Sequence, residues 1–177
     1  MPARRYRATS WYDARVEVRP SLIQGGGMFA LEAISAAEIV AIIGGTVMTE
    51  DEFRAYIATV PRFNATQIGE RLHLVDLIQT PEKVAGSLNH SCEANLWLRD
   101  EVTIVARRDI AAGEELTLDY ALTTVEADWQ LDQPCQCGTP VCRQIIRGTD
   151  WQLPDVQERY RGHFAPFINE RIRQSRQ

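Results

Sequence analysis

The chain has 177 residues, of which 45% are hydrophobic and 24% are charged, and its net charge is −5. This length is sufficient for one globular domain with its own core, and the composition excludes fibrous and disordered classes. No apolar run approaches the roughly 20 residues of a membrane-spanning helix, and no apolar segment follows the basic N-terminus. We therefore expect no signal peptide, no membrane partner and a reducing compartment, cytoplasmic or nuclear.

The charge is distributed unevenly along the chain. Residues 1–19 carry five arginines against two acidic residues, and residues 143–177 carry seven arginines against four acidic residues. The intervening stretch is therefore strongly acidic. An acidic centre favours a basic protein partner and disfavours direct nucleic-acid binding, although solvated charges that only maintain solubility explain the pattern equally well.

Short strands dominate the predicted secondary structure up to residue 120. Apolar, β-prone runs at 39–43, 72–75 and 102–105 are separated by glycine and small polar residues, which is typical of strands joined by tight turns. A weak internal repeat relates residues 30–40 to residues 106–116 at five positions. The repeat carries little weight, because matches among such common residue types arise by chance.

Helices are expected in two places. Thr49 and Glu52 have the spacing of a capping box, and apolar residues follow at helical spacing before Pro61, which predicts one short helix. The Arg-rich C-terminal tail, which contains Trp151 and Tyr160, is predicted to form further helices that pack apolar side chains against the domain.

The four cysteines form the most informative pattern in the sequence. Cys135, Cys137 and Cys142 have the spacing C-x-C-x4-C, and Cys92 lies 43 residues before the first of them. Four thiolates can close a tetrahedral zinc site with Zn–S distances near ~2.3 Å. The C-x-C pair is too tight for an easy disulfide, and a reducing compartment favours metal over two disulfides, with free buried thiols as the other alternative. We therefore predict one structural zinc ion, whose binding would contribute to folding by joining the C-terminal cysteines to the turn at 89–92.

Three motifs occur in a fixed order with these cysteines. Residues 25–30 read Gly-Gly-Gly-Met-Phe-Ala, residues 89–92 read Asn-His-Ser-Cys, and residues 108–120 read Arg-Asp-Ile-Ala-Ala-Gly-Glu-Glu-Leu-Thr-Leu-Asp-Tyr. Together with C-x-C-x4-C, they make the chain similar to the SET-domain protein-lysine methyltransferases over residues 20–148.

The resemblance implies a mainly β fold of the SET type, a β-clip-like arrangement of short strands and small sheets with a knot-like core. We expect an N-terminal extension at residues 1–19, the SET domain at 20–124, a zinc-bound post-SET segment at 134–148, and a helical tail at 149–177.

The resemblance also assigns roles to individual residues, with S-adenosylmethionine as the methyl donor. The catalytic residue would be Tyr120, whose hydroxyl lies where the methyl group passes from the sulfonium to the amine. The expected cofactor contacts are Gln24, Gly25, Gly26, Gly27, Met28, Asn89, His90 and Tyr120. The expected zinc ligands are Cys92, Cys135, Cys137 and Cys142.

In the implied reaction, a protein lysine attacks the methyl group by direct displacement. The lysine has an ordinary pKa near ~10.4, and an apolar channel next to a sulfonium favours its neutral form. No general base is therefore required, and none is assigned to His73, His90 or His163.

Other functions remain open at this level. A degenerate SET-like module would bind peptide or cofactor without turnover, and a zinc-stabilised nucleic-acid-binding domain is disfavoured by the acidic centre. Residues 121–124 lack the Phe or Tyr that sets the number of methyl groups in similar proteins. The sequence therefore predicts a basic protein substrate, such as a histone, but neither its identity, the degree of methylation nor the oligomeric state.

Overall fold

The computed structural model describes residues 6–61, 63–77 and 88–176. The first five residues of the predicted N-terminal extension therefore lie outside the described residues. The strands are β1 (Trp11–Tyr12), β2 (Val16–Pro20), β3 (Gly26–Ala30), β4 (Ile39–Ile42), β5 (Thr46–Thr49), β6 (Asn64–Gly69), β7 (Leu72–Asp76), β8 (Asn89–His90), β9 (Leu96–Leu98), β10 (Thr103–Ala106) and β11 (Glu115–Leu118). The helices are α1 (Glu50–Ile57), α2 (Pro154–Arg159) and α3 (Pro166–Gln174), with 3-10 turns η1 (Tyr120–Leu122) and η2 (Asp150–Gln152).

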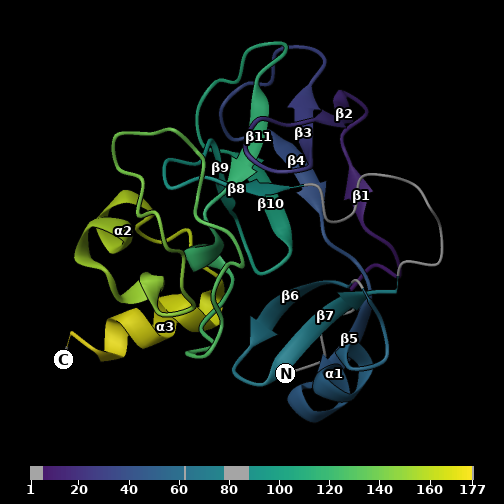
Figure 1. Cartoon of the computed structure of the whole chain (residues 1–177), viewed down its shortest axis with the longest axis vertical. Coiled ribbons are helices and arrows are strands. Elements are labelled where there is room, and N and C mark those ends of the chain that lie inside the picture. The colour runs from purple at the N-terminus through teal and green to yellow at the C-terminus, as the bar shows by residue number, and fades with distance from the viewer. Residues whose placement is uncertain (1–5, 62, 78–87, 177) are drawn as a thin grey trace.

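The strands form three small sheets, which confirms the predicted mainly β fold. Two four-stranded sheets have the orders β1-β4-β10-β9 and β2-β3-β11-β8, and a three-stranded sheet has the order β5-β7-β6. The four-stranded sheets occupy the upper part of Figure 1, and the third sheet lies with α1 at the lower right. The knot-like core stays a prediction.

One strand pair determines where the Asn-His-Ser-Cys motif and the motif that ends at Tyr120 meet. β8 pairs with β11 in parallel, so Asn89 lies beside Thr117 and His90 beside Leu118. Because η1 follows β11 directly, this register brings the Asn-His turn next to Tyr120.

Helix α1 begins as its sequence predicts. The Thr49 hydroxyl accepts a hydrogen bond from the Glu52 backbone, and the Glu52 carboxylate accepts one from the Thr49 backbone. This reciprocal capping satisfies two backbone donors that the first turn otherwise leaves unpaired.

The internal repeat corresponds to a structural pairing between its two copies. Ile34 and Ile110 form an antiparallel bridge. The Ala30 backbone donates to the Glu114 carbonyl, and the Ala106 backbone donates to the Glu38 carbonyl. In both bonds the alanine of one copy donates to the glutamate of the other copy, so the two copies are related by an approximate twofold axis.

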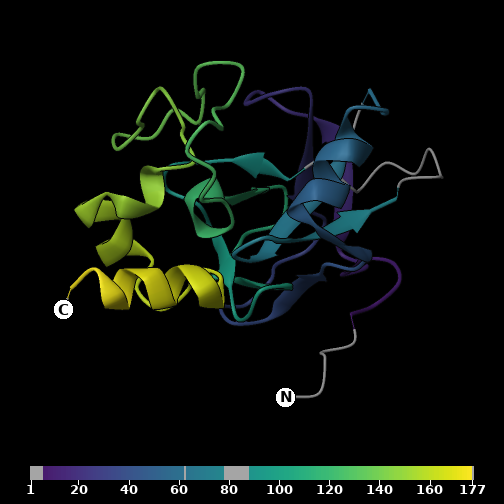
Figure 2. The same ribbon diagram turned by 90° about the horizontal axis from the view of Figure 1, so that it is seen from below.

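The C-terminal helices share the core of the strands. Val156, Tyr160, Phe164 and Ile168 belong to the same buried hydrophobic cluster as Leu116 of β11. Figure 2 shows α3 on the opposite side of the molecule from α1, as does Figure 1. The tail is therefore packed against the domain, as predicted.

Within the described ranges, no helix has the length and apolarity that crossing a membrane requires.

Candidate active site

Tyr120, the first residue of η1, is held in place by hydrogen bonds from its backbone amide and from its side-chain hydroxyl. Its backbone amide donates to His90 Nδ1 at 3.2 Å, and its hydroxyl donates to the Leu88 carbonyl at 2.9 Å. The His90 ring stands edge-on to the phenol, with ring centroids 5.1 Å apart. Burial raises the pKa of Tyr120 to about 12 and lowers the pKa of His90 to about 4, so both side chains are neutral near pH 7.

The glycine-rich loop before β3 is fixed by two polar side chains. The Asn89 amide nitrogen lies 3.1 Å from the Gln24 carbonyl, 3.2 Å from the Gly26 carbonyl and 2.8 Å from Glu115 Oε1. A Cβ on Gly27 would lie 2.2 Å from the same Glu115 oxygen, so a larger residue there would displace this carboxylate from Asn89. Asn89 therefore holds the loop backbone directly, and Glu115 supports the loop through Asn89 and the Ser21 hydroxyl.

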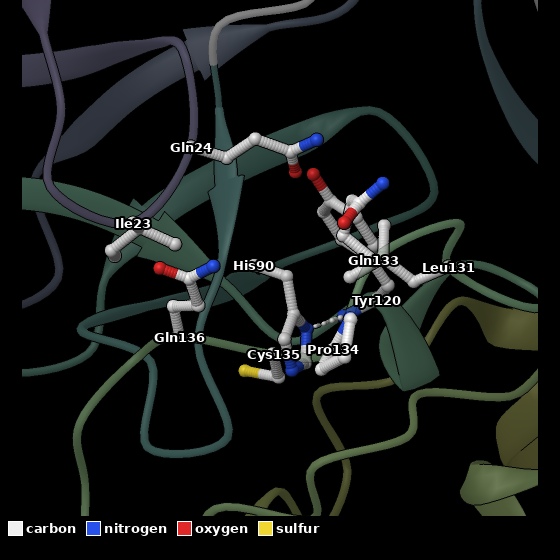
Figure 3. A pocket seen from close by; sticks show the side chains of 9 residues that line it. All are labelled: Ile23, Gln24, His90, Tyr120, Leu131, Gln133, Pro134, Cys135 and Gln136. Atoms are coloured by element: carbon white, nitrogen blue, oxygen red, sulfur yellow. Dashed lines mark hydrogen bonds between the residues drawn. The ribbon is translucent and has the colours of Figure 1, made fainter.

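A cavity of about 250 Å³ lies beside this loop and is called the smaller cavity below. Its lining residues are Ile23, Gln24, His90, Tyr120, Leu131, Gln133, Pro134, Cys135 and Gln136. In Figure 3, Gln24 from the loop and Gln136 from the cysteine-rich segment approach it from different sides, and a dashed line joins His90 to Tyr120. The cavity thus combines amide groups with apolar walls from segments far apart in the sequence.

A second cavity of about 400 Å³, the larger cavity, also contains Tyr120 in its wall. Aromatic side chains such as Phe53 and Trp129 line it, and its acidic lining residues are Asp76, Glu101 and Glu126. Among the described residues that line it there is no lysine or arginine. Tyr120 therefore stands between a cavity next to the glycine loop and an aromatic, acidic cavity.

The four cysteines meet in space, as their spacing predicts. Their sulfur atoms all lie within 4.8 Å of one another, an arrangement that can hold a metal ion. Burial raises the pKa of the Cys92 thiol to about 12, whereas hydrogen bonds from Thr139 and from neighbouring cysteines together outweigh burial at Cys137 and lower its pKa to about 6. We call Cys92, Cys135, Cys137 and Cys142 the cysteine cluster.

A buried ion pair connects the cysteine cluster to the Tyr120 turn. The Arg143 guanidinium donates two hydrogen bonds to Asp119, at 2.8 and 2.7 Å, and the Arg143 backbone donates to Cys92 Sγ at 3.3 Å. The Asp119 carboxylate is fully buried and caps η1 by accepting from the Ala121 backbone. Charge-assisted bidentate bonds of this kind fix geometry as well as adding energy.

The structure brings most of the predicted site residues to one place. Gln24, His90 and Tyr120 line the smaller cavity, whereas Asn89 lies behind the loop and the Met28 side chain is buried in the core. Gly25, Gly26 and Gly27 form the loop and the start of β3.

Sequence reasoning missed Glu115, which supports the glycine loop, and the ion-pair residue Arg143. Both stand inside or directly beside quoted motifs, since Glu115 is the second Glu of the Glu-Glu pair and Arg143 follows Cys142. Their partners, however, are distant in sequence, so the motifs alone did not reveal their contacts.

Comparison with known proteins identifies the class to which this fold and site belong. A family model described as SET domain matches residues 25–121, just over half of the chain. The chain therefore belongs to the SET-domain family. A crystal structure of the methyltransferase domain of human histone-lysine N-methyltransferase SETMAR has the same fold, with a TM-score of 0.56, 23% identity, and coverage of 74% of this chain and 57% of that chain.

Two sequence relatives illustrate the similarity. The chain is 32% identical over 146 residues to histone-lysine N-methyltransferase ash1 of Drosophila melanogaster, covering 75% of this chain and 6% of that protein. It is 33% identical over 141 residues to the H3 lysine-4 specific histone-lysine N-methyltransferase of Saccharomyces cerevisiae, covering 71% of this chain and 12% of that protein. The chain thus spans only a small part of the length of these relatives.

Proposed function

We propose that this protein transfers a methyl group from S-adenosylmethionine to a lysine side chain of another protein. The observation that carries the proposal is the position of Tyr120 in the walls of both cavities. A methyl donor in the smaller cavity and a lysine in the larger cavity would meet at this phenol. Holding two reactants in line lowers the barrier without any covalent enzyme intermediate.

The lining of each cavity suits the reactant assigned to it. Around the donor, Gln24 lies in the wall of the smaller cavity on a loop that Asn89 holds in place, and neutral His90 adds no positive charge beside a sulfonium. Around the lysine, aromatic walls favour the uncharged amine that must attack, and carboxylates such as Asp76 favour the approach of a basic protein.

In this proposal Tyr120 positions the reacting groups and stays protonated. Its hydroxyl donates to the Leu88 carbonyl, so its oxygen lone pairs remain available to the polarised methyl hydrogens. The other predicted cofactor contacts, Gly25, Gly26, Gly27, Met28 and Asn89, would act through the loop backbone or by holding it.

We also propose that the cysteine cluster binds one structural zinc ion. Tetrahedral coordination at ~2.3 Å separates the sulfurs by about 3.8 Å, which agrees with four sulfurs within 4.8 Å of one another. Four thiolates leave no open coordination position, so zinc would take no part in the chemistry. It would instead stabilise the fold of the segment around Cys135, which forms one wall of the smaller cavity.

The division into residues 1–19, 20–124, 134–148 and 149–177 stays a prediction.

The test is transfer of labelled methyl groups to a basic protein mixture, followed by mass-spectrometric mapping of the modified residue. We expect label on lysine, and we expect Tyr120→Phe to reduce transfer by about 10²-fold, because alignment at the junction is lost. Binding of S-adenosylmethionine by Tyr120→Phe should remain within about twofold of wild type, since one phenolic hydroxyl contributes little to ground-state binding of the cofactor.

Tyr160→Phe is the matched control. Tyr160 is more deeply buried than Tyr120, its hydroxyl bonds to the backbone of Ala94 and Cys92, and it lines neither cavity. This variant should lose about 1 kcal/mol of stability and keep its transfer rate. Equal loss of rate in both variants would contradict the role of Tyr120, and cofactor binding without any transfer would favour the inactive binding module instead.

The substrate is proposed only as a class. A basic protein, such as a histone, in the nucleus or cytoplasm fits the acidic lining of the larger cavity. Mapping methylated lysines after incubation with lysate from the protein's own source would identify it.

A further inference from the structure

A second group of side chains that could hold a metal ion lies at the larger cavity, with two of its three members in the cavity wall. Glu50 is the first residue of α1, His73 is in β7, and Glu126 follows η1. His73 Nε2 is 2.7 Å from Glu50 Oε2 and 3.6 Å from Glu126 Oε1, and the three ligand atoms lie within 4.8 Å of one another. We call these residues the carboxylate–imidazole cluster.

In each carboxylate, one oxygen faces His73 and the other faces Arg54. Arg54 contacts Glu50 Oε1 at 2.5 Å and lies 3.9 Å from Glu126 Oε2. Glu50 Oε2 and Glu126 Oε1 therefore face the imidazole, while the opposite oxygens face the guanidinium. An ion bound between the three inner atoms would not have to displace Arg54, which would orient the carboxylates from outside as supporting partners do at metal sites.

The imidazole and its partners are held rigidly. The His73 side chain is 3% exposed, and Phe53 stacks on its ring at a centroid distance of 4.1 Å and an angle of 14°. The Glu126 carbonyl accepts from the Trp129 backbone, and a Cβ on Gly148 would lie 1.9 Å from that carbonyl oxygen. Preorganised donors of this kind lose little conformational freedom when an ion binds.

The charges leave the cluster suited to a cation. Two carboxylates face one guanidinium. A metal ion at His73 Nε2 would replace the hydrogen bond between this nitrogen and Glu50 Oε2. His73 and Glu126 also line the larger cavity, so the inner face of the cluster is accessible from it. Imidazole with two carboxylates is a donor set that suits zinc and similar divalent transition metals rather than calcium.

We propose that Glu50, His73 and Glu126 bind a divalent transition-metal ion of the zinc type, through Glu50 Oε2, His73 Nε2 and Glu126 Oε1. Three protein ligands leave at least one coordination position, which opens toward the larger cavity. An ion there places positive charge in the cavity assigned to a basic substrate. Metal at this site therefore inhibits methyl transfer by weakening substrate binding, a consequence that rests on the proposed function.

The binding test is titration of the full chain with Co²⁺ after the cysteine cluster has been loaded with Zn²⁺. A site of nitrogen and oxygen ligands produces d–d absorption without the intense charge-transfer bands of cobalt thiolate, so the two sites are distinguished by spectrum. We expect one additional equivalent of Co²⁺ to bind with d–d bands alone. Glu126→Gln and, separately, Glu50→Gln should each weaken this binding at least tenfold.

Asp51→Asn is the matched control. Asp51 lies beside Glu50 in the first turn of α1, but its side chain is 88% exposed and it is not part of the cluster. Asp51→Asn should bind Co²⁺ as wild type does. Thermal unfolding of all variants without added metal separates loss of the site from loss of the fold.

The kinetic test adds Zn²⁺ to the transfer reaction. Zn²⁺ should raise the KM for the basic substrate without changing kcat, and Glu126→Gln should lose this sensitivity. Absence of d–d absorption, or equal affinity in wild type and folded Glu126→Gln, would overturn the site. Absence of any methyl transfer would instead contradict the proposed function, and the spectroscopic result would still decide whether the site exists.

Discussion

The two proposed metal sites differ in how far their members can be recognised from the sequence. In the cysteine cluster, three members share the motif C-x-C-x4-C and all four are the same uncommon residue type. In the carboxylate–imidazole cluster, Glu50, His73 and Glu126 come from a helix, a strand and a loop, and nothing in their local sequence connects them. The spacing of residues in the sequence therefore reveals a set of metal ligands only where most of the ligands are close together in the chain.

The clusters also differ in how they are joined to the rest of the protein. The cysteine cluster contacts Arg143, whose buried ion pair with Asp119 reaches the Tyr120 turn. The carboxylate–imidazole cluster is bordered by Arg54, whose side chain is 54% exposed. We therefore expect substitutions on the cysteine side to cost much more stability than substitutions around α1.

The largest expected effect is the removal of the proposed zinc ion from the cysteine cluster. Structural zinc contributes apparent free energies of about 10–16 kcal/mol in zinc-finger peptides, so chelation should unfold the surrounding segment. Trp129 packs against this cluster, and its fluorescence should therefore change on chelation. Cys135→Ser should show the same change without chelator.

The control for this prediction is Trp129→Phe, in which chelation should no longer change the fluorescence to the same extent. Loss of bound metal with an unchanged spectrum in the wild-type protein would show that the segment folds independently of metal.

A smaller effect is expected from breaking the buried ion pair. Arg143→Gln leaves the fully buried Asp119 carboxylate without its cation, and such losses typically cost about 3–5 kcal/mol. Urea denaturation measures the change in the free energy of unfolding. The matched variant is Arg108→Gln, since Arg108 pairs with Glu114 at the surface, with side chains 56% and 29% exposed, where a loss below about 1 kcal/mol is expected. Similar losses in both variants would remove the proposed contrast between buried and exposed pairs.

The smallest effect is expected at the start of α1. Thr49→Ala removes the hydroxyl that accepts from the Glu52 backbone, and loss of such a cap costs about 1 kcal/mol. Thr59→Ala is the comparison, because Thr59 lies past the C-terminal end of α1 and its hydroxyl donates to the Tyr56 carbonyl, so it caps no first-turn amide. If Thr49→Ala destabilised the protein as much as Arg143→Gln, the α1 side would be as tightly coupled to the fold as the cysteine side.

Much of the fold was predictable because its signals are local. The capping box at Thr49 and Glu52 predicted α1, and the β-prone run at 72–75 predicted β7. The four cysteines were grouped correctly, while their role as zinc ligands and that of Tyr120 in catalysis stay predictions. The internal repeat was weak in sequence but is a real pairing through Ile34 and Ile110. Backbone hydrogen bonds of this kind can form between almost any residue types, so the sequence gives little indication of them.

The sequence by itself determined the family, the helix start and the set of cysteines, because each depends on residue types at fixed short spacing. Only the tertiary structure decided that β8 lies parallel to β11, that Arg143 reaches Asp119, and that Glu50 and Glu126 meet at His73. These contacts join distant segments, and their geometry follows from how the sheets pack rather than from any local preference of the chain.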